Sequence, residues 1–253
     1  KEKMKVIYQK PESLTSTTST YCPGCGHGII QKIIAEVIDE LNIRTKTIGV
    51  APVGCAVLSY NYFNFDVTEA AHGRAPAVAT AIKRLLPNRI VFTYQGDGDL
   101  AAIGTAEIIH AATRGENLSV FFINNAVYGM TKGQMAPTTI PGQKTTTTIA
   151  GRNPEIHGYP LRICELLSSI DGIRYLERTT TSDIPGIIAT KKAIKRAFLH
   201  QIGNNKGMAF VEILATCPTN WKKTPSESMV WIKEVMEKYY PVKIYKEPHE
   251  IIK

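Results

Sequence analysis

Apolar residues recur along the chain in two patterns. Between residues 29 and 41 they lie one, three and four positions apart, which predicts one face of a helix. Shorter runs rich in apolar residues predict buried strands instead, at Thr47–Ala51, Ile90–Tyr94, Leu118–Ile123, Gly172–Glu177 and Met208–Leu214. Helical spacing returns between these runs, at residues 76–86, 100–113 and 187–202, and a last helix is expected at about 227–239.

This alternation predicts an α/β fold, with a mostly parallel sheet and helices on both of its faces. We expect one domain over residues 21–240, after an extended, Thr-rich N-terminal lead-in (1–20) and before a charged C-terminal tail (241–253). A chain of 253 residues, 43% of them hydrophobic, is large enough for such a domain. Residues 134–152 are rich in Pro, Gly and Thr and predict a long loop, of the kind that often carries function.

Composition excludes several classes of protein. No run approaches the roughly 20 apolar residues that span a bilayer, and no apolar stretch follows the basic N-terminus as a secretory signal requires. We therefore expect a soluble, cytoplasmic protein without membrane association. The net charge of +8 is densest at Lys191, Lys192, Lys195 and Arg196, on one face of a predicted helix. A solvated helix surface is favoured over a docking patch for an acidic protein, and no aromatic-interleaved basic motif supports nucleic-acid binding.

A glycine-rich acidic turn follows the strand predicted at Ile90–Tyr94. In Gly96-Asp97-Gly98-Asp99 the glycines let the backbone approach a ligand closely, and the helix that follows directs free N–H groups toward an anion. A carboxylate beside a diphosphate requires a cation between the two. Asp97 is therefore a candidate ligand of Mg²⁺, which prefers oxygen and bridges to phosphates.

A second polar turn, Asn124-Asn125-Ala126-Val127, follows the next predicted strand. The carboxyl ends of parallel strands border the crevice in which open α/β sheets bind ligands. Asn125 can add an amide oxygen there and Val127 its carbonyl. Two ordinary turns are the alternative, because Asp, Asn and Gly favour turns anyway.

Five cysteines, an odd and sparse set, argue against a disulfide framework. Cys22 and Cys25 form a Cys-x-x-Cys pair, whereas Cys55 and Cys217 each follow a predicted strand, so the four thiols can converge. Four thiolates bind an iron–sulfur cluster or a structural zinc ion, and a single pair also fits a thioredoxin-like redox motif. The spacing slightly favours the cluster, because zinc sites usually contain two such pairs. Cys164 lies in an apolar helical stretch and is expected in the core.

Taken together, the motifs resemble those of a known family. Gly-Asp-Gly followed by Asn is the signature of the thiamine diphosphate enzymes. The β-subunit of the 2-oxoacid:ferredoxin oxidoreductases shares a longer ordered set, here at residues 22–26, 54–55, 72–75, 96–99, 128–134 and 217–221. This resemblance extends from about Thr20 to Trp231. The motif Tyr-Gly-Met-Thr-Lys-Gly-Gln is similar to the 2-oxoglutarate and branched-chain 2-oxoacid branches of that family.

The resemblance implies a thiamine-diphosphate-binding fold of the diphosphate-side type, with defined roles for its residues. Asp97, Asn125 and Val127 would bind Mg²⁺. Cys22, Cys25, Cys55 and Cys217 would hold a [4Fe–4S] cluster. Cofactor contacts would come from Val53, Gly54, Cys55, Ala56, His72, Gly73, Gly96, Gly98, Asp99, Gly129, Met130 and Thr131. Lys132, for a substrate carboxylate or phosphate oxygen, and His72 are the candidate catalytic residues. Their alternatives are an exposed loop lysine and a helix-capping turn.

The implied activity is the oxidative decarboxylation of a 2-oxoacid, either 2-oxoglutarate or a branched-chain one, with coenzyme A. Electrons would pass through the cluster to ferredoxin or a ferredoxin-like subunit. The chain has room only for the diphosphate-side domain, so we expect an α-type subunit with the pyrimidine-side domain. A non-redox thiamine diphosphate decarboxylase subunit with structural cysteines is the alternative function, and a zinc-containing nucleic-acid binder ranks last. The sequence does not choose between the 2-oxoacids.

Overall fold

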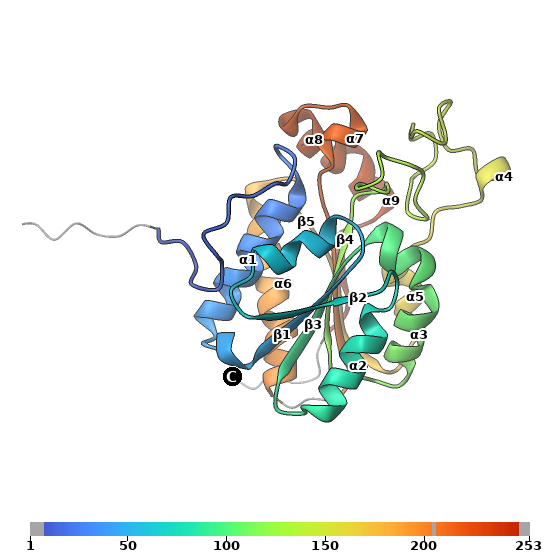
Figure 1. The fold of residues 1–253 in the computed structure, drawn as a ribbon. Coiled ribbons are helices and arrows are strands. Elements are labelled where there is room, and N and C mark those ends of the chain that lie inside the picture. Colours follow the sequence, from blue (N-terminus) through green and yellow to red (C-terminus); the bar gives the residue numbers. More distant parts are fainter. Residues whose placement is uncertain (1–7, 204–205, 248–253) are drawn as a thin grey trace, which may run out of the picture.

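The computed structural model describes residues 8–203 and 206–247. Within these ranges seven strands form one sheet in the order β2-β1-β3-β4-β6-β5-β7 (Figure 1). The strands are β1 (Thr47–Pro52), β2 (Asp66–Ala70), β3 (Ile90–Gly96), β4 (Ser119–Asn124), β5 (Ile173–Thr180), β6 (Met208–Leu214) and β7 (Lys243–Lys246). All neighbours pair in parallel except β7, which runs antiparallel to β5. The predicted α/β fold with a mostly parallel sheet is confirmed.

Helices cover both faces of this sheet. They are α1 (Gly26–Glu40), α2 (Ala75–Leu85), α3 (Thr105–Thr113), α4 (Pro154–His157), α5 (Ile163–Leu167), α6 (Ile184–Ile202), α7 (Pro218–Trp221), α8 (Pro225–Trp231) and α9 (Glu237–Tyr239). Short 3-10 segments lie at Arg44–Lys46 (η1) and Cys55–Asn61 (η2), and π-helical ones at Asp99–Ile103 (η3) and Ile232–Met236 (η4). The cores place α1 and α6 on one face and α2, α3 and α5 on the other (Figure 1). None of these helices is long and apolar enough to cross a membrane.

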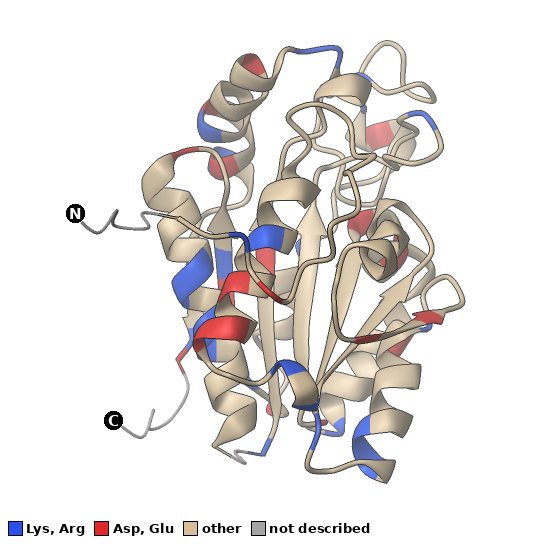
Figure 2. Ribbon diagram, turned by 60° about the vertical axis from the view of Figure 1, so that its left-hand side comes forward, with Lys and Arg blue, Asp and Glu red and all other residues tan. Residues whose placement is uncertain are grey.

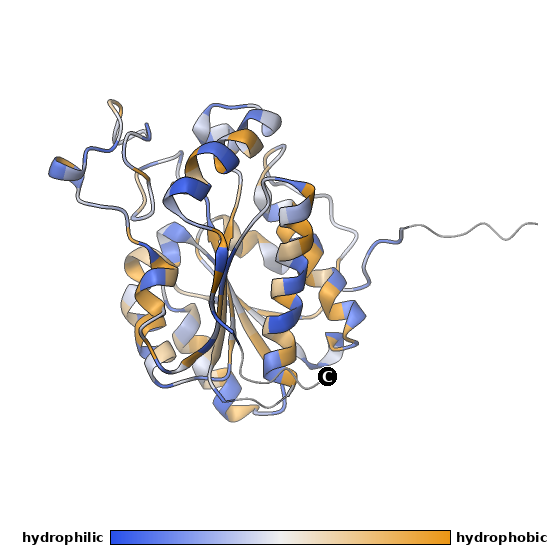
Figure 3. Cartoon of the chain, turned by 180° about the vertical axis from the view of Figure 1, so that it is seen from behind, coloured by the Kyte–Doolittle hydropathy of each residue, from blue (hydrophilic) through white to orange (hydrophobic). Residues whose placement is uncertain are grey.

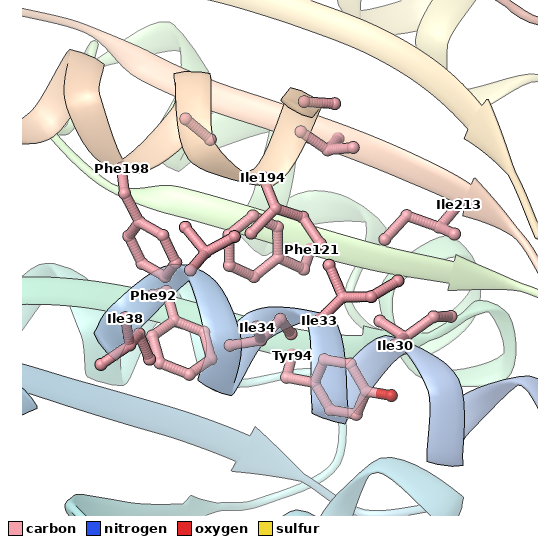
Figure 4. Packing of buried hydrophobic residues seen from close by; sticks show 14 of the residues in the cluster. Ile30, Ile33, Ile34, Ile38, Phe92, Tyr94, Phe121, Ile194, Phe198 and Ile213 are labelled. Atoms are coloured by element: carbon pink, nitrogen blue, oxygen red, sulfur yellow. The ribbon is translucent and has the colours of Figure 1, made fainter. Parts of the chain in front are cut away.

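Aromatic and branched side chains fill the space between the sheet and α1 and α6. Phe198 of α6 meets Phe92 and Phe121 edge-on, at ring-centroid distances of 5.7 and 5.2 Å, while Ile34 and Ile38 approach from α1 (Figure 4). On the other face the neighbouring residues of the same strands are buried as well. Every residue of β4 is buried, which explains why its middle, Val120–Ile123, is a continuous apolar run rather than an alternating one. The apolar colour follows the sheet and the inner sides of the helices (Figure 3).

Two edge strands were not predicted. β2 has the sequence Asp-Val-Thr-Glu-Ala, and its Asp66 and Glu69 are exposed. Charged side chains are common on edge strands, where they discourage pairing with other chains, and here they conceal the apolar signal. β7 lies inside the segment expected to be a charged tail and covers the other edge by pairing with β5.

The basic cluster on α6 is largely neutralised by neighbouring carboxylates. Lys191 and Lys195 approach Glu40 of α1 at 2.7 and 3.1 Å, and Arg196 approaches Glu177 of β5 at 3.0 Å. Basic and acidic residues are interspersed over the described ribbon rather than separated (Figure 2). The structure therefore supports the interpretation of this cluster as a solvated helix surface.

Candidate active site

Residues from the turns at the carboxyl ends of β1, β3 and β4 line one cavity. The helices α7 and α8 lie at the top of Figure 1. The volume of the cavity is about 90 Å³, and it is lined by His27, Val53, Gly54, Cys55, Ala56, His72, Gly96, Asp97, Gly98, Asp99, Asn125, Val127, Tyr128, Gly129, Met130 and Thr131. All three candidate Mg²⁺ ligands belong to this lining. So does every candidate cofactor contact except Gly73.

Asp97 lies in the wall of this cavity and is 2% exposed. Its carboxylate accepts hydrogen bonds from the Thr138 hydroxyl at 2.7 Å and from the Gly98 N–H at 2.8 Å. Burial raises the pKa of Asp97 to about 7, although these bonds act in the opposite direction. A divalent cation would restore the ionised form, so the chemistry of this carboxylate fits a metal ligand.

The turn after β4 presents oxygen atoms beside Asp97. Ala126 has a left-handed backbone with φ of 58°, which turns the chain sharply. The Asn125 carbonyl accepts a hydrogen bond from the Trp221 indole at 3.1 Å, and the Ala126 carbonyl accepts one from the Thr139 hydroxyl at 2.6 Å. No residue in the described part of the chain donates to the Val127 carbonyl. That oxygen therefore suits the expected role of a ligand.

Glycines leave room in the wall for a ligand. A Cβ atom added to Gly96 would meet no protein atom within 4 Å, and the same holds at Gly54, whose φ is 111°. Gly98 has a different role, because an added Cβ would lie 2.3 Å from the ring of Tyr128. The space at Gly96 can hold part of an anionic cofactor, whereas Gly98 lets the turns after β3 and β4 pack together.

Asp99 holds a neighbouring turn in place. Its carboxylate accepts hydrogen bonds from His72 Nδ1 at 2.5 Å, the Gly73 N–H at 2.6 Å and Gln95 Nε2 at 2.7 Å. Asp99 is 2% exposed, and burial raises its pKa. Asp99 also lines the cavity, and its side chain fixes His72 and Gly73 beside it; the contact with a diphosphate stays a prediction.

The His72–Gly73 turn also leads into a helix, as expected if it were only a helix-capping turn. It lies two residues before α2, and Gly73 has φ of 78°. A Cβ at Gly73 would lie 2.7 Å from the Gly104 N–H at the start of α3. His72 nevertheless lines the cavity, so the turn both begins a helix and presents a side chain to the site.

Four of the five cysteines gather at one side of the cavity. A Cβ atom on Gly129 would lie 3.4 Å from Cys55 Sγ and 3.8 Å from Cys217 Sγ. Burial raises the pKa of Cys25 to about 12 and that of Cys55 to about 11, and in both cases the neighbouring thiols raise it further. All cysteines are free, and Cys22 is exposed. Burying several thiols so close together favours a cationic or metal partner for their thiolates.

Two metal groups were considered for these thiols, a structural zinc ion and an iron–sulfur cluster. Among the described residues, no three His, Cys, Asp or Glu side chains are positioned to hold a metal ion together. A structural zinc ion needs four ligands at one point. An iron–sulfur cube needs one thiolate at each of four corners, so its ligands are spread more widely. The four thiols therefore stay candidates for either group, and iron and sulfide analysis of the purified protein distinguishes the two.

Two further expectations concern residues outside the cavity. Cys164 is fully buried in the core, as predicted. Lys132 is exposed, has a left-handed backbone with φ of 79° and is not part of the lining. It follows Thr131, which does line the cavity, so its side chain lies at the rim.

Sequence reasoning missed two residues of the lining. His27 is 2% exposed and its Nδ1 lies 2.6 Å from the Tyr94 hydroxyl. Burial lowers its pKa to about 4, so it is neutral at physiological pH. Tyr128 covers Gly98. Both residues adjoin motifs identified in the sequence. His27 follows Cys-Pro-Gly-Cys-Gly, and Tyr128 begins Tyr-Gly-Met-Thr. This adjacency could have indicated that they belong to the site.

Comparisons with known proteins agree with this geometry. The family described as "Thiamine pyrophosphate enzyme, C-terminal TPP binding domain" matches residues 52–213. The ketoisovalerate oxidoreductase subunit VorA of Methanothermobacter thermautotrophicus is 47% identical, over 96% of this chain and 53% of that protein. The 2-oxoglutarate synthase subunit KorB of Methanocaldococcus jannaschii is 36% identical, over 85% of this chain and 77% of that protein. The chain thus spans about half the length of the VorA relative.

A solved structure shows the same fold. The 2-oxoglutarate:ferredoxin oxidoreductase from Magnetococcus marinus, with 2-oxoglutarate, coenzyme A and succinyl-CoA bound, superposes with a TM-score of 0.75 at 24% identity, over 96% of this chain and 87% of that one. Thiamine pyrophosphate is another name for thiamine diphosphate, so the family match and the cavity indicate the same cofactor. The chain belongs to the thiamine pyrophosphate enzymes, and within them to the β-subunit family of the 2-oxoacid:ferredoxin oxidoreductases.

Proposed function

We propose that this chain is the β-type subunit of an enzyme that oxidatively decarboxylates a 2-oxoacid. The 2-oxoacid, coenzyme A and two oxidised ferredoxins would give acyl-CoA, CO₂, one proton and two reduced ferredoxins. One observation carries this proposal: Gly129 lies beside Asn125 of the metal turn and also beside Cys55 and Cys217, two of the four thiols fit for a cluster. A site that binds only one of the two groups would not need this proximity.

The residues of the cavity have distinct tasks in this proposal. Asp97, Asn125 and the Val127 carbonyl hold Mg²⁺, which neutralises the diphosphate. The space beside Gly54 and Gly96 receives the cofactor, and Gly129, Met130 and Thr131 close its far side. His72, fixed by Asp99, contacts the cofactor from the β2–α2 turn. When bound, thiamine diphosphate supplies a nucleophilic carbon and accepts the electrons released by decarboxylation.

The four cysteines provide the route for electrons. Cys22, Cys25, Cys55 and Cys217 bind a [4Fe–4S] cluster, which accepts single electrons. Cys22 is exposed, so ferredoxin could approach a cluster held there from the side of this residue. The net charge of +8 favours an acidic acceptor of this kind.

A partner subunit completes the cofactor site. The cavity of about 90 Å³ is much smaller than the about 300–1,000 Å³ of ordinary small-molecule sites, so this chain encloses only part of the cofactor. Val53 and Met130 at its wall are 43% and 45% exposed, and such apolar side chains suit a subunit interface. We propose an α-type subunit whose pyrimidine-side domain covers them.

The substrate is a 2-oxoacid of the branched-chain or the 2-oxoglutarate type. The higher identity with the ketoisovalerate oxidoreductase subunit, 47% against 36% for the 2-oxoglutarate synthase subunit, favours a branched-chain 2-oxoacid. Lys132 at the rim remains a candidate for the substrate carboxylate or a phosphate oxygen.

The test is to purify the complex without oxygen and to measure ferredoxin or viologen reduction with ketoisovalerate and with 2-oxoglutarate. Iron, acid-labile sulfide, Mg²⁺ and thiamine diphosphate are determined in parallel. Asp97→Asn should release Mg²⁺ and the cofactor while iron is retained; Asp171→Asn, at an exposed position, is the control. A complex that releases CO₂ but contains no iron and reduces no acceptor would be a non-redox decarboxylase, and the proposal would be wrong.

A further inference from the structure

The segment from Cys217 to Trp221 is a short bridge between the two halves of the site. It follows β6 and forms α7. Asn220 donates from its side-chain Nδ2 to the Gly129 carbonyl at 2.8 Å and to Cys217 Sγ at 3.2 Å. An amide NH₂ group carries two hydrogens, so one side chain can make both bonds at once.

Both acceptors of Asn220 belong to the proposed site, whereas Asn220 itself does not line the cavity. Cys217 is a candidate cluster ligand, and Gly129 begins the loop that closes the cavity. The side chain is also closely packed, because a Cβ atom on Gly133 would lie 3.0 Å from Asn220 Cβ. The Asn220 side chain therefore contacts the loop near both Gly129 and Gly133.

The next residue connects the same bridge to the metal turn. The Trp221 indole N–H donates to the Asn125 carbonyl at 3.1 Å. Cys217, Asn220 and Trp221 thus contact the thiol cluster, the cofactor loop and the metal turn, respectively. Nothing in the proposed chemistry requires these contacts, since neither Asn220 nor Trp221 reaches the cavity.

We propose that Asn220 is a positioning residue that couples the cluster to the occupancy of the cofactor site, and this inference rests on the proposed function. The hydrogen bond to Cys217 favours the more negative, reduced cluster and so raises its reduction potential. The hydrogen bond to Gly129 holds the loop in its closed position. Because one amide makes both bonds, binding of the cofactor changes the hydrogen bond to sulfur, and reduction of the cluster changes cofactor affinity reciprocally.

The experiment compares the wild-type complex with Asn220→Asp, which keeps the size of the side chain but removes both N–H donors. The reduction potential and the EPR spectrum of the cluster are recorded with and without thiamine diphosphate, and cofactor affinity is measured by calorimetry. We expect a potential that shifts on cofactor binding in wild type. In the variant we expect a lower potential, no such shift and roughly fivefold to tenfold weaker cofactor binding.

Thr219→Ala is the matched control, because Thr219 is an exposed residue of the same helix and makes no side-chain hydrogen bond among the described residues. It should behave as wild type in every measurement. If Asn220→Asp loses the cluster, Asn220→Ser, which keeps one donor, replaces it; with the cluster retained, its cofactor-dependent shift should still disappear.

The outcomes separate this inference from the proposed function. Full iron and cofactor content with the same potential and the same shift in wild type and variant would overturn the role of Asn220 alone. A merely structural role would reduce cluster content or thermal stability without changing the potential of the clusters that remain, and that result also contradicts the inference. A wild-type complex without iron would contradict the proposed function itself and the inference with it.

Discussion

Thr138 donates a hydrogen bond of 2.7 Å to Asp97, although 41 residues separate them in the sequence. The Thr138 carbonyl in turn accepts a hydrogen bond of 2.5 Å from the Tyr240 hydroxyl. The long loop after β4 is thus fixed between the candidate metal ligand and the C-terminal helices. This explains how a segment without strands or helices contributes to an ordered site.

Removing the hydrogen bond from Thr138 to Asp97 should weaken metal-dependent cofactor binding. The bond lowers the pKa of Asp97, so Thr138→Val raises it above its value of about 7. Mg²⁺ binds the ionised carboxylate, and protonation competes increasingly as the pH falls. We expect about tenfold weaker binding of Mg²⁺ and thiamine diphosphate at pH 7, with a larger deficit at pH 6 than at pH 8, by calorimetry. Thr138→Ser keeps the hydroxyl and should resemble wild type; equal deficits at both pH values would contradict this mechanism.

Two cysteine variants should separate cluster binding from core packing. Cys217→Ser should abolish the visible absorbance and the iron content of the purified protein, because one of four thiolates is lost. Cys164→Ser should retain both and change the free energy of unfolding by no more than about 1 kcal/mol, because the buried hydroxyl can donate a hydrogen bond to the neighbouring Glu212. Undiminished iron in Cys217→Ser would disprove the assignment of that ligand.

Two alanine substitutions should distinguish ligand space from packing. In Gly96→Ala the new methyl group meets no protein atom, so stability should stay within about 0.5 kcal/mol of wild type. Cofactor affinity should nevertheless fall roughly tenfold or more, because the methyl group occupies ligand space. In Gly98→Ala the methyl group collides with Tyr128, which should cost about 1–3 kcal/mol of stability. Denaturant titration and calorimetry measure the two effects; unchanged affinity in Gly96→Ala would place the cofactor elsewhere.

An ion pair near the sheet edge, between the buried Arg178 and the partly exposed Glu165, predicts a pH-dependent stability. Burial by itself would raise the pKa of Glu165, but the hydrogen bonds and charge of Arg178 outweigh it and lower this pKa to about 2 from an ordinary value of 4.5. Because the folded-state value is depressed, the stabilisation is fully present above pH 4.5 and is lost as the pH falls toward 2.

The stability difference between wild type and Glu165→Gln should therefore shrink between pH 4.5 and pH 2. Urea titrations at several pH values within this window measure it. A difference that is constant across the window would show that the charge of Glu165 contributes nothing. Glu155→Gln, at an exposed position, is a control and should show no such trend.

The central strands could be predicted because they are buried on both faces. β3 and β4 contain the apolar runs Ile90–Phe92 and Val120–Ile123, and β6 was predicted with its observed bounds, Met208–Leu214. β2 and β7 could not be predicted, because edge strands need only one neighbour and tolerate charged side chains such as Asp66 and Lys243. The helix predicted over residues 100–113 is also divided, since Asp99–Ile103 forms a π-helical turn before Gly104.

The positions of the site residues could be predicted where these residues lie at the ends of strands. Asp97 and Asn125 terminate adjacent parallel strands, so their proximity follows from the topology. The contacts that fix them do not, because Thr138 and Trp221 approach from loops whose course depends on tertiary packing. For the same reason the sequence did not reveal that the Asp99 carboxylate accepts hydrogen bonds from His72, Gly73 and Gln95.

The last strand, β7, also affects whether the protein associates with other copies of itself. β7 pairs with Leu176–Arg178 of β5 and covers backbone groups that would otherwise be free at that edge of the sheet. A shortened chain ending before Lys243 would offer those groups to any extended peptide, including a second copy of itself. Self-association that grows with protein concentration, visible in the analytical ultracentrifuge, is the behaviour to expect from such a truncation.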